Sequence, residues 1–213
     1  MHHNKLNFNF ETNQFILQKI GLIDSFKGKW DVIENKENTY LKELRKIATI
    51  ESIGSSTRIE GVQMTDTEIK DLLADIKITK LETRDQQEAA GYYEALSLIL
   101  DEYDRIPITE NHIKQLHQIL LGKSEKDTRH RGEYKKLSNS VAARYPNGSE
   151  KIIFQTTEPF LVNEEMSQLT DWINNNLNKE DIHPLIVTAT AVYEFLSIHP
   201  FQDGNGRLAR LLT

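Results

Sequence analysis

Apolar residues along most of this chain recur at intervals of three and four positions, with charged residues between them. This spacing places the apolar side chains on one face of an α-helix. The predicted helices cover residues 40–53, 65–76, 84–103, 109–120, 163–173 and 185–198. The last of these segments is the most apolar, and we expect it to form a buried central helix. The pattern therefore predicts an all-α fold.

Polar residues mark the starts of several of these helices. Thr65 is followed three positions later by Glu68, which is the pattern of a capping box. Thr109 and Asn163 can each cap the helix that follows them. Pro184 stands at the start of the most apolar helix, a position that suits proline because the first helical N–H has no partner within the helix.

The stretch from 134 to 157 lacks the helical spacing. Two β-compatible runs, 138–145 and 151–157, are separated by the sequence Pro-Asn-Gly-Ser. Asn-Gly between two such runs is typical of a type I′ turn, because both central residues of that turn need positive φ. We therefore expect a small β-hairpin inserted in the helical domain.

Composition narrows the classes of protein. The 213 residues suit one large domain or a core with a small appendage. A net charge of −6 argues against a diffuse nucleic-acid binder but is compatible with a local basic pocket for one anion. The absence of cysteine excludes disulfides, zinc–thiolate sites and cysteine nucleophiles. No apolar run approaches the roughly 20 residues that span a bilayer, and no signal peptide is visible, so we expect a cytoplasmic protein without a membrane partner.

The segment from 198 to 213 carries a candidate anion-binding site. Gly204, Asn205 and Gly206 predict a tight loop whose backbone is little obstructed by side chains. A new helix is expected near Arg207, so that loop amides and a helix N-terminus would together form a cradle for phosphate. Arg210 lies three positions after Arg207, on the same helix face, and both guanidinium groups can reach one polyphosphate.

Two further residues of this segment suit phosphate chemistry. Asp203 is a hard oxygen ligand for Mg²⁺ carried by the phosphate, and His199 can act as a general base. Taken singly, a histidine before proline, an Asp-Gly-Asn-Gly turn and two helical arginines are more often structural or solvent-exposed. Their occurrence within a dozen residues favours the functional interpretation. The segment is not a P-loop, which requires GxxxxGK[ST].

The run HPFQDGNGRLAR at 199–210 resembles the signature of Fic-domain proteins, HPFx(D/E)GNGRxxR, at every fixed position. The same family resemblance extends to EAAGYYEAL at 88–96, LHQILLG at 116–122, RGEY at 131–134 and HPLIVTATAVYEFLSIHPF at 183–201. The resemblance thus runs from about residue 84 to the end. It implies the Fic fold, a helical bundle with a small inserted β-hairpin called the flap.

The resemblance also implies an activity, because Fic proteins mostly transfer AMP from ATP to a hydroxyl group of a target protein and release pyrophosphate. His199 would deprotonate the Ser, Thr or Tyr hydroxyl, Phe201 would anchor the loop, and Asp203 would bind Mg²⁺ between the α- and β-phosphates. Residues 204–207 would form the anion hole, and Arg210 would hold the γ-phosphate. The hairpin would cover the site and pair with the target protein by strand addition.

A second motif, Ser-Thr-Arg-Ile-Glu-Gly at 56–61, resembles the inhibitory helix of Fic proteins, [S/T]xxxE[G/N]. Ser56 and Glu60 are four residues apart and share a helix face, and Gly61 permits the helix to end. Alone, such a glutamate is more often solvated. N-terminal to a full signature, it implies that Glu60 pairs with Arg210, displaces the γ-phosphate and makes the enzyme autoinhibited.

The resemblance leaves other functions open. Members of the family also transfer UMP, phosphate or phosphocholine, and some inhibited members remove AMP. A catalytically silent nucleotide-sensing regulator is the alternative from another class. Arg207 and Arg210 favour ATP and AMP transfer, while an intact His199 and Asp203 argue against a silent regulator.

The predicted organisation has two parts. Residues 1–83 form an N-terminal helical region with the inhibitory helix at about 53–61, and residues 84–213 form the Fic catalytic core. Because Arg210 stands three residues before Thr213 and relatives continue with another core helix, the resemblance implies a truncated core. Some relatives self-associate to inhibit themselves, so a homo-oligomer is also among the partners that the resemblance allows.

Overall fold

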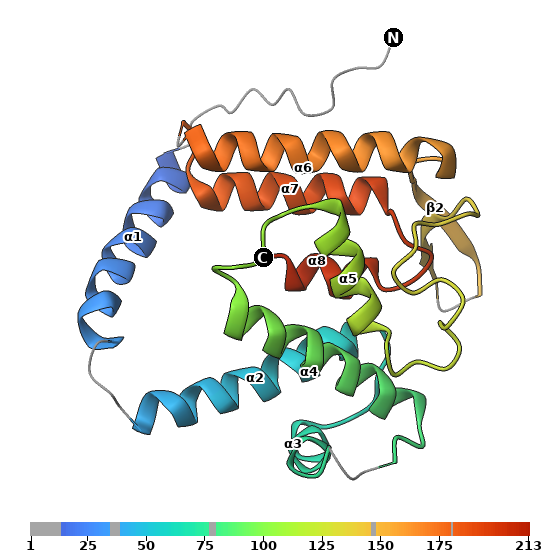
Figure 1. The fold of residues 1–213 in the computed structure, drawn as a ribbon, viewed down its shortest axis with the longest axis horizontal. Helices are drawn as coiled ribbons and strands as arrows, with labels where there is room; N and C mark the ends of the chain where they lie inside the picture. The colour runs from blue at the N-terminus through green and yellow to red at the C-terminus, as the bar shows by residue number, and fades with distance from the viewer. Residues whose placement is uncertain (1–13, 35–38, 77–79, 146–147, 180) are drawn as a thin grey trace. The chain divides into compact units, whose positions relative to one another are not determined.

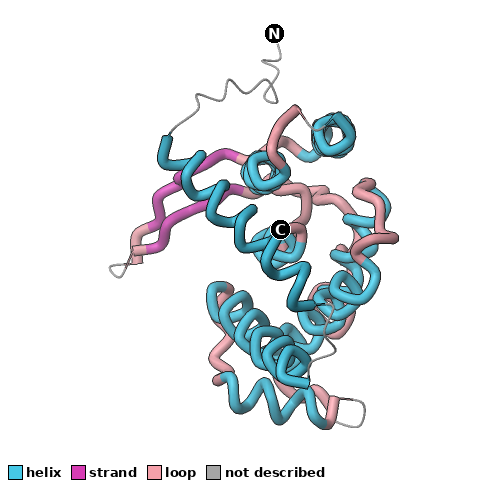
Figure 2. Tube along the Cα trace, turned by 90° about the vertical axis from the view of Figure 1, so that its left-hand side faces the viewer, coloured by secondary structure: helices cyan, strands magenta, loops and turns pink. Residues whose placement is uncertain are grey.

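The structure is a computed structural model that describes residues 14–34, 39–76, 80–145, 148–179 and 181–213. These residues form eight α-helices, one 3-10 helix and one two-stranded antiparallel sheet (Figures 1 and 2). In chain order the elements are α1 (Gln14–Glu34), α2 (Thr39–Ile59), α3 (Asp66–Ala74), α4 (Arg84–Glu102), α5 (Glu110–Leu120), β1 (Ser140–Arg144), β2 (Glu150–Gln155), η1 (Pro159–Leu161), α6 (Val162–Lys179), α7 (Pro184–Ile198) and α8 (Asn205–Leu211). The predicted all-α fold with one inserted hairpin is confirmed.

The chain divides into two compact units, residues 1–49 and 50–213. In the first unit, α1 exposes Phe15, Leu22 and Phe26. The second unit contains the last ten residues of α2 and all later elements, so the predicted inhibitory segment belongs to the same unit as the Fic signature. The proposed boundary at 83/84 stays a prediction.

The short helix α8 lies at the centre of the second unit. It contacts α4, α5 and α7, while α6 and α7 lie side by side (Figure 1). Its buried residues are Asn205, Arg207, Leu208, Ala209 and Leu211. The helix that carries most of the predicted phosphate-binding residues is therefore also the helix around which this unit packs.

The helix α7 is buried on one face only. Val187 and Phe195 are buried, but Leu185 and Leu196 are exposed, and Tyr193 is 64% exposed. The prediction of a buried central helix thus holds for one face of α7 only: α7 contacts α6 and α8, and the face that carries Leu185, Tyr193 and Leu196 is exposed.

The helix starts agree with the sequence in most cases. Thr65 forms the predicted capping box, and Thr109 caps α5 by accepting a hydrogen bond from a backbone N–H in the first turn. Pro184 is the first residue of α7, as predicted. The cap predicted at Asn163 is wrong, because the 3-10 turn of η1 runs directly into α6 and the helix already begins at Val162.

The hairpin of β1 and β2 interrupts the helices between α5 and α6 (Figure 2). Its strands pair antiparallel, with an irregularity between Val141 and Ala142. Gly148 has φ of +82°, which suits the predicted turn, whereas Asn147 lies outside the described residues. The hairpin is confirmed, and the type I′ geometry stays a prediction.

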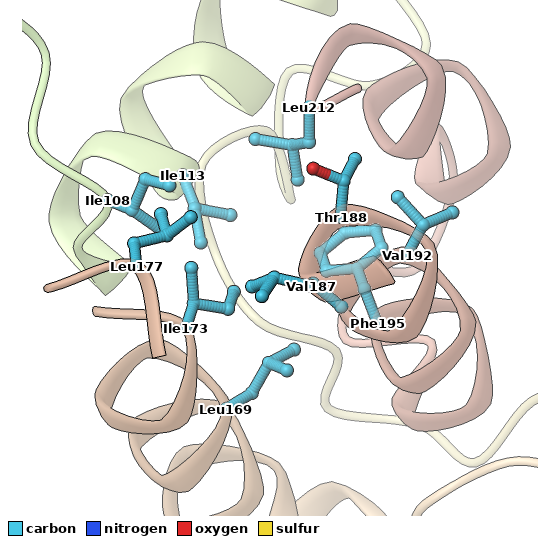
Figure 3. A pocket seen from close by; sticks show the side chains of 11 residues that line it. Ile108, Ile113, Leu169, Ile173, Leu177, Val187, Thr188, Val192, Phe195 and Leu212 are labelled. Carbon is cyan, nitrogen blue, oxygen red and sulfur yellow. The ribbon is translucent and has the colours of Figure 1, made fainter. Parts of the chain in front are cut away.

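A pocket among α5, α6 and α7 is almost entirely apolar (Figure 3). Its lining residues are Ile108, Ile113, Leu169, Ile173, Leu177, Val187, Thr188, Ala191, Val192, Phe195 and Leu212. Thr188 is the one polar side chain among them, so this pocket offers nothing to hold a phosphate. None of the described helices combines the length and the apolar character needed to cross a membrane.

Candidate active site

The site begins where α7 ends. His199 is the C-cap of α7 and adopts φ 53° and ψ 59°, and it is the only non-glycine residue with positive φ in the described part of the chain. Burial lowers the pKa of its ring, and the positive charge of Lys135 lowers it further. The contact of Nδ1 with the Leu196 carbonyl at 3.4 Å raises the pKa but does not outweigh burial. His199 is therefore neutral at neutral pH and able to accept a proton.

The loop after His199 is folded back by Asn205. The side chain of Asn205 accepts a hydrogen bond from the Phe201 N–H at 2.9 Å and donates one to the Phe201 carbonyl at 2.8 Å. Phe201 is fully buried and stacks on the ring of His117, with centroids 3.8 Å apart. Gly204 has φ of +80° and precedes the first residue of α8. The loop thus delivers the backbone amides of the α8 N-terminus beside His199.

Asp203 forms the acidic part of this loop. Its Oδ1 accepts hydrogen bonds from the Gly204 N–H at 2.6 Å and from Arg207 at 3.2 Å, and its Oδ2 lies 3.2 Å from Nζ of Lys126. Burial raises the pKa of Asp203, but the charges of Arg207 and Lys126 outweigh burial and hold the pKa below its usual value. The carboxylate is therefore ionised and lies among cations.

Arg207 is held inside the protein. It is 1% exposed, and it pairs with Asp203 and with Glu88 of α4, which is 4% exposed; the Arg207–Glu88 distance is 3.1 Å. Glu88 also accepts a hydrogen bond from Arg84 at 2.5 Å. The Arg207 guanidinium is thus placed to orient Asp203.

Arg210 meets the end of α2. Its Nε donates to the Ser56 hydroxyl at 2.6 Å, and its NH2 group donates to the Ser56 carbonyl at 2.9 Å and to Glu60 Oε1 at 2.7 Å. The Glu60 carboxylate also lies against Gly206, where an added Cβ would be 2.5 Å from Oε1. Gly61 has φ of +100° just after the helix. The structure therefore brings the predicted inhibitory residues onto the predicted phosphate site.

His117 was not predicted from the sequence, although it supports the loop. Its Nδ1 accepts a hydrogen bond from the Gly132 N–H at 2.8 Å, so Nε2 carries the proton that is donated to the Asp203 carbonyl at 3.0 Å. Burial lowers its pKa to about 4. A signal was present in the sequence, because His117 falls on the apolar face of its helix beside Leu116 and Leu120.

Three other residues of the site were also missed. Glu88 has a comparable signal, since a glutamate among the small and aromatic residues that α4 buries must have a partner. Lys126 and Lys135 lie in a loop rich in charged residues, and nothing in their spacing distinguishes them from exposed neighbours. Lys126 contacts Asp203 and Lys135 contacts Ile198, so both contacts depend on how this loop packs against a distant part of the chain.

Comparison with known proteins identifies a matching family. Residues 107–213 match the model of a family described as Fic/DOC. The curated "Protein adenylyltransferase Fic" of Drosophila willistoni is 28% identical over 197 residues, which are 92% of this chain and 37% of the relative. That of Drosophila melanogaster is 28% identical over 194 residues, which are 89% of this chain and 37% of the relative. The chain thus spans little more than a third of these relatives.

Solved structures agree with the fold. A Fic domain containing signaling protein from Bacteroides thetaiotaomicron matches with a TM-score of 0.75 and 29% identity, over 89% of this chain and 69% of that one. A Fic family protein from Desulfovibrio desulfuricans matches with a TM-score of 0.75 over 95% of this chain and 57% of that one. At 24% identity, the second likeness concerns the fold alone.

Proposed function

Because this chain belongs to the Fic/DOC family, we propose that it is a protein adenylyltransferase, which moves AMP from ATP to a Ser, Thr or Tyr hydroxyl of a target protein and releases pyrophosphate. The observation that carries the proposal is the loop between α7 and α8. The seven residues from His199 to Asn205 bring together a histidine whose pKa is lowered, an ionised aspartate and the first amide of helix α8. The names of the similar curated proteins point to the same reaction.

His199 acts as the general base in this proposal. Its neutral ring takes the proton of the target hydroxyl as the hydroxyl oxygen attacks the α-phosphorus of ATP. The bond from the α-phosphorus to the bridging oxygen breaks, and the electron pair leaves with pyrophosphate. Little covalent chemistry is required of the protein, and most of the rate enhancement comes from orientation and charge stabilisation.

The phosphates are bound by backbone and by arginine. Amides at the start of α8 point outward from an unfinished helical turn, and their partial positive charge suits the α- and β-phosphates. Arg210, once free of Glu60, binds the γ-phosphate through its planar fork of N–H groups. The buried pair of Glu88 and Arg207 keeps Asp203 in place.

Magnesium suits this site as an ion that arrives with ATP. The described residues contain no group of three or more acidic or histidine side chains that could hold a metal by themselves. Mg²⁺ commonly binds one or two carboxylates and completes its shell with phosphates and water. Asp203 is ionised and offers one such carboxylate. When bound, the ion would neutralise charge on the phosphates.

Autoinhibition is part of the proposal. Ser56 and Glu60 together occupy the Nε and NH2 donors of Arg210. A carboxylate and a phosphate compete for the same bidentate geometry on arginine. While Glu60 holds Arg210, ATP has no partner for its γ-phosphate and is bound in an unproductive pose.

The target protein is proposed to pair with the hairpin. All six residues of β2 are exposed, and the hairpin contains only two strands in the described part of the chain. Each strand is therefore an edge strand of this sheet, and an extended target segment can add to such an edge. Strand addition would place the target hydroxyl beside His199.

The test compares Glu60→Gly with the wild-type chain. We expect the substitution to raise incorporation of AMP from radiolabelled ATP, including automodification, by at least tenfold, because Arg210 becomes free for the γ-phosphate. Glu51→Gly, at an exposed position of the same helix α2, is the control and should leave the rate within twofold of wild type. Equal rates in Glu60→Gly and wild type would contradict autoinhibition.

The base is tested in the released protein. His199→Ala in the Glu60→Gly background should abolish AMP transfer while the Kd for ATP changes less than twofold, because the phosphate-binding groups remain. Intact mass spectrometry after incubation with ATP, UTP or CDP-choline identifies the transferred group. Labelling by UTP or CDP-choline alone would replace AMP transfer with another Fic chemistry. Binding of ATP without any labelling would indicate a silent regulator.

A further inference from the structure

The backbone of His199 needs a restraint. Residues other than glycine rarely adopt positive φ, and such a conformation persists only where the surrounding structure enforces it. His199 combines this conformation with the position between Ile198, the last residue of α7, and Pro200. Whatever holds the carbonyl groups on either side of His199 also fixes the direction of its ring.

Lys135 binds both of these carbonyl groups. Its backbone N–H donates to the Pro200 carbonyl at 2.8 Å, and its ammonium donates to the Ile198 carbonyl at 3.2 Å. One residue, 63 positions away from Ile198 in sequence, thus spans His199 from one side to the other. A rotation of the His199 backbone toward ordinary φ would move at least one of these carbonyl groups away from Lys135.

The Lys135 ammonium also joins the two ends of the hairpin. It donates to Asn139 Oδ1 and to Thr156 Oγ1, both at 2.8 Å. Asn139 directly precedes β1 and Thr156 directly follows β2. Lys135 is 3% exposed, and its burial lowers its pKa to about 8 although Glu158 and Glu165 oppose the shift. A buried ammonium is costly unless its donors are satisfied, and here three oxygens satisfy them.

Asn139 strengthens the same connection. Its Nδ2 donates to the Phe201 carbonyl at 3.1 Å, and its Oδ1 lies 2.6 Å from the Thr156 hydroxyl. The carbonyl groups of Ile198, Pro200 and Phe201 therefore all accept hydrogen bonds from Lys135 or Asn139 at the base of the hairpin. This set of contacts links the surface proposed to receive the target with the residue proposed to take its proton.

We propose that Lys135 is a positioning residue that holds His199 in its left-handed conformation and couples it to the base of the β1–β2 hairpin. The inference rests on the proposed function, in which His199 accepts the proton of the target hydroxyl. A target segment that adds to the hairpin then acts on His199 through Lys135, so the base is aligned most firmly when a target is bound.

The charge of Lys135 also affects the pKa of His199, which gives a second measurable effect of this role. Burial lowers the pKa of His199, its contact with the Leu196 carbonyl raises it, Lys135 lowers it, and Glu60 and Asp203 raise it. Loss of the Lys135 charge removes one of the two influences that lower this pKa. The neutral, proton-accepting form of His199 would then appear only at higher pH.

The experiment replaces Lys135 in the Glu60→Gly background. Lys135→Met should reduce the automodification rate with ATP at least tenfold, while the Kd for ATP stays within twofold, because the phosphate-binding groups do not contact Lys135. The acidic limb of the pH–rate profile should move to higher pH. Lys135→Arg keeps the charge and should restore part of the rate and the original limb. Lys136→Met removes a lysine from the adjacent exposed position and is the matched control.

A spectroscopic readout separates this inference from the proposed function. NMR titration of the His199 imidazole in the Glu60→Gly protein should give a higher pKa after Lys135→Met and no change after Lys136→Met. Should Lys135→Met fail to fold, Thr156→Val removes one hydrogen-bond partner of the ammonium and keeps its charge, so it should lower the automodification rate and leave the acidic limb in place; an unchanged rate would overturn the positioning role.

The outcomes are distinct. An unchanged rate together with an unchanged His199 pKa in Lys135→Met would overturn the positioning role. If the Glu60→Gly parent transfers no group from ATP, the proposed function fails. In that case a shifted imidazole titration still supports the role of Lys135, and an unshifted titration overturns it.

Discussion

At the scale of single residues, Glu88 and Arg207 form a buried ion pair beside the site. Both side chains are almost fully buried, and Glu88 is the only carboxylate besides Asp203 that pairs with Arg207 in the described residues. Removing one partner of a buried ion pair leaves an uncompensated charge, which typically costs about 3–5 kcal/mol. The buried charge of Arg207 is therefore stabilised by Glu88 of α4.

Glu88→Gln tests this dependence. It keeps the shape of the side chain and removes its charge, so we expect the free energy of unfolding to fall by about 3 kcal/mol in urea titrations at neutral pH. Glu102→Gln, which removes the charge of a half-exposed glutamate paired with Arg105 at the end of the same helix, should change this free energy by less than about 0.5 kcal/mol. Equal effects of the two substitutions would mean that Glu88 contributes no more than a surface charge.

The sequence allowed the residues of the loop to be predicted, but not those that support it. His199, Asp203 and Arg210 stand in one short signature, so their proximity follows from chain connectivity. Glu88 and Lys135 reach the same loop from other elements, 119 and 63 positions from their bonded partners Arg207 and Ile198. Contacts of this kind depend on how helices pack, which local spacing does not specify.

At the scale of elements, α4 and α5 approach each other closely at Gly91. An added Cβ at this position would lie 2.1 Å from the Leu120 carbonyl oxygen, a backbone atom that no side-chain rotation can move. Gly91→Ala should therefore lower the free energy of unfolding by about 1–3 kcal/mol, the usual cost of overpacking a core, when measured by urea titration. Gly28→Ala on α1, where nothing lies within 4 Å, is the control and should not destabilise the protein. A neutral Gly91→Ala would show that the two helices can separate freely.

Elements could be predicted where local interactions decide them. The capping residues Thr65 and Thr109 act within one helical turn, and both predictions hold. The cap at Asn163 failed because Pro159 starts a 3-10 turn that feeds into α6. The exposed face of α7 was missed for a related reason, since an apolar sequence does not reveal how many neighbours a helix will have.

At the scale of the whole molecule, the second unit brings together segments from both halves of its sequence. Ser56 and Glu60 bind Arg210 across about 150 positions. The sequence could suggest this pairing only through resemblance to a family, because neither helix periodicity nor charge spacing links residues so far apart. In the structure, Arg58 bonds Asp66 at 2.8 Å and the Gln63 N–H bonds Asp85 at 2.7 Å, so α3 and α4 fix the end of α2.

Stability of this unit should depend on pH through His117. The pKa of His117 falls from 6.5 to about 4 in the folded protein because the ring is buried. As pH drops from 6.5 towards 4, the unfolded chain takes up a proton that the folded chain refuses, so stability is lost in this window and is fully present above it. Each unit by which the pKa of His117 differs between the folded and unfolded chain changes the free energy of unfolding by up to about 1.4 kcal/mol.

His117→Gln removes this proton uptake and tests its size. The variant should be less stable than wild type at pH 7, because the bonds to Gly132 and Asp203 are disturbed. Its deficit should shrink by about 2 kcal/mol between pH 7 and pH 4.5, since only wild type loses the His117 contribution there. Other titrating groups are common to both proteins and cancel in the difference. Urea titrations at five pH values measure the slope, with His112→Gln on the same helix as control; a deficit that stays constant with pH would mean that His117 titrates normally in the fold.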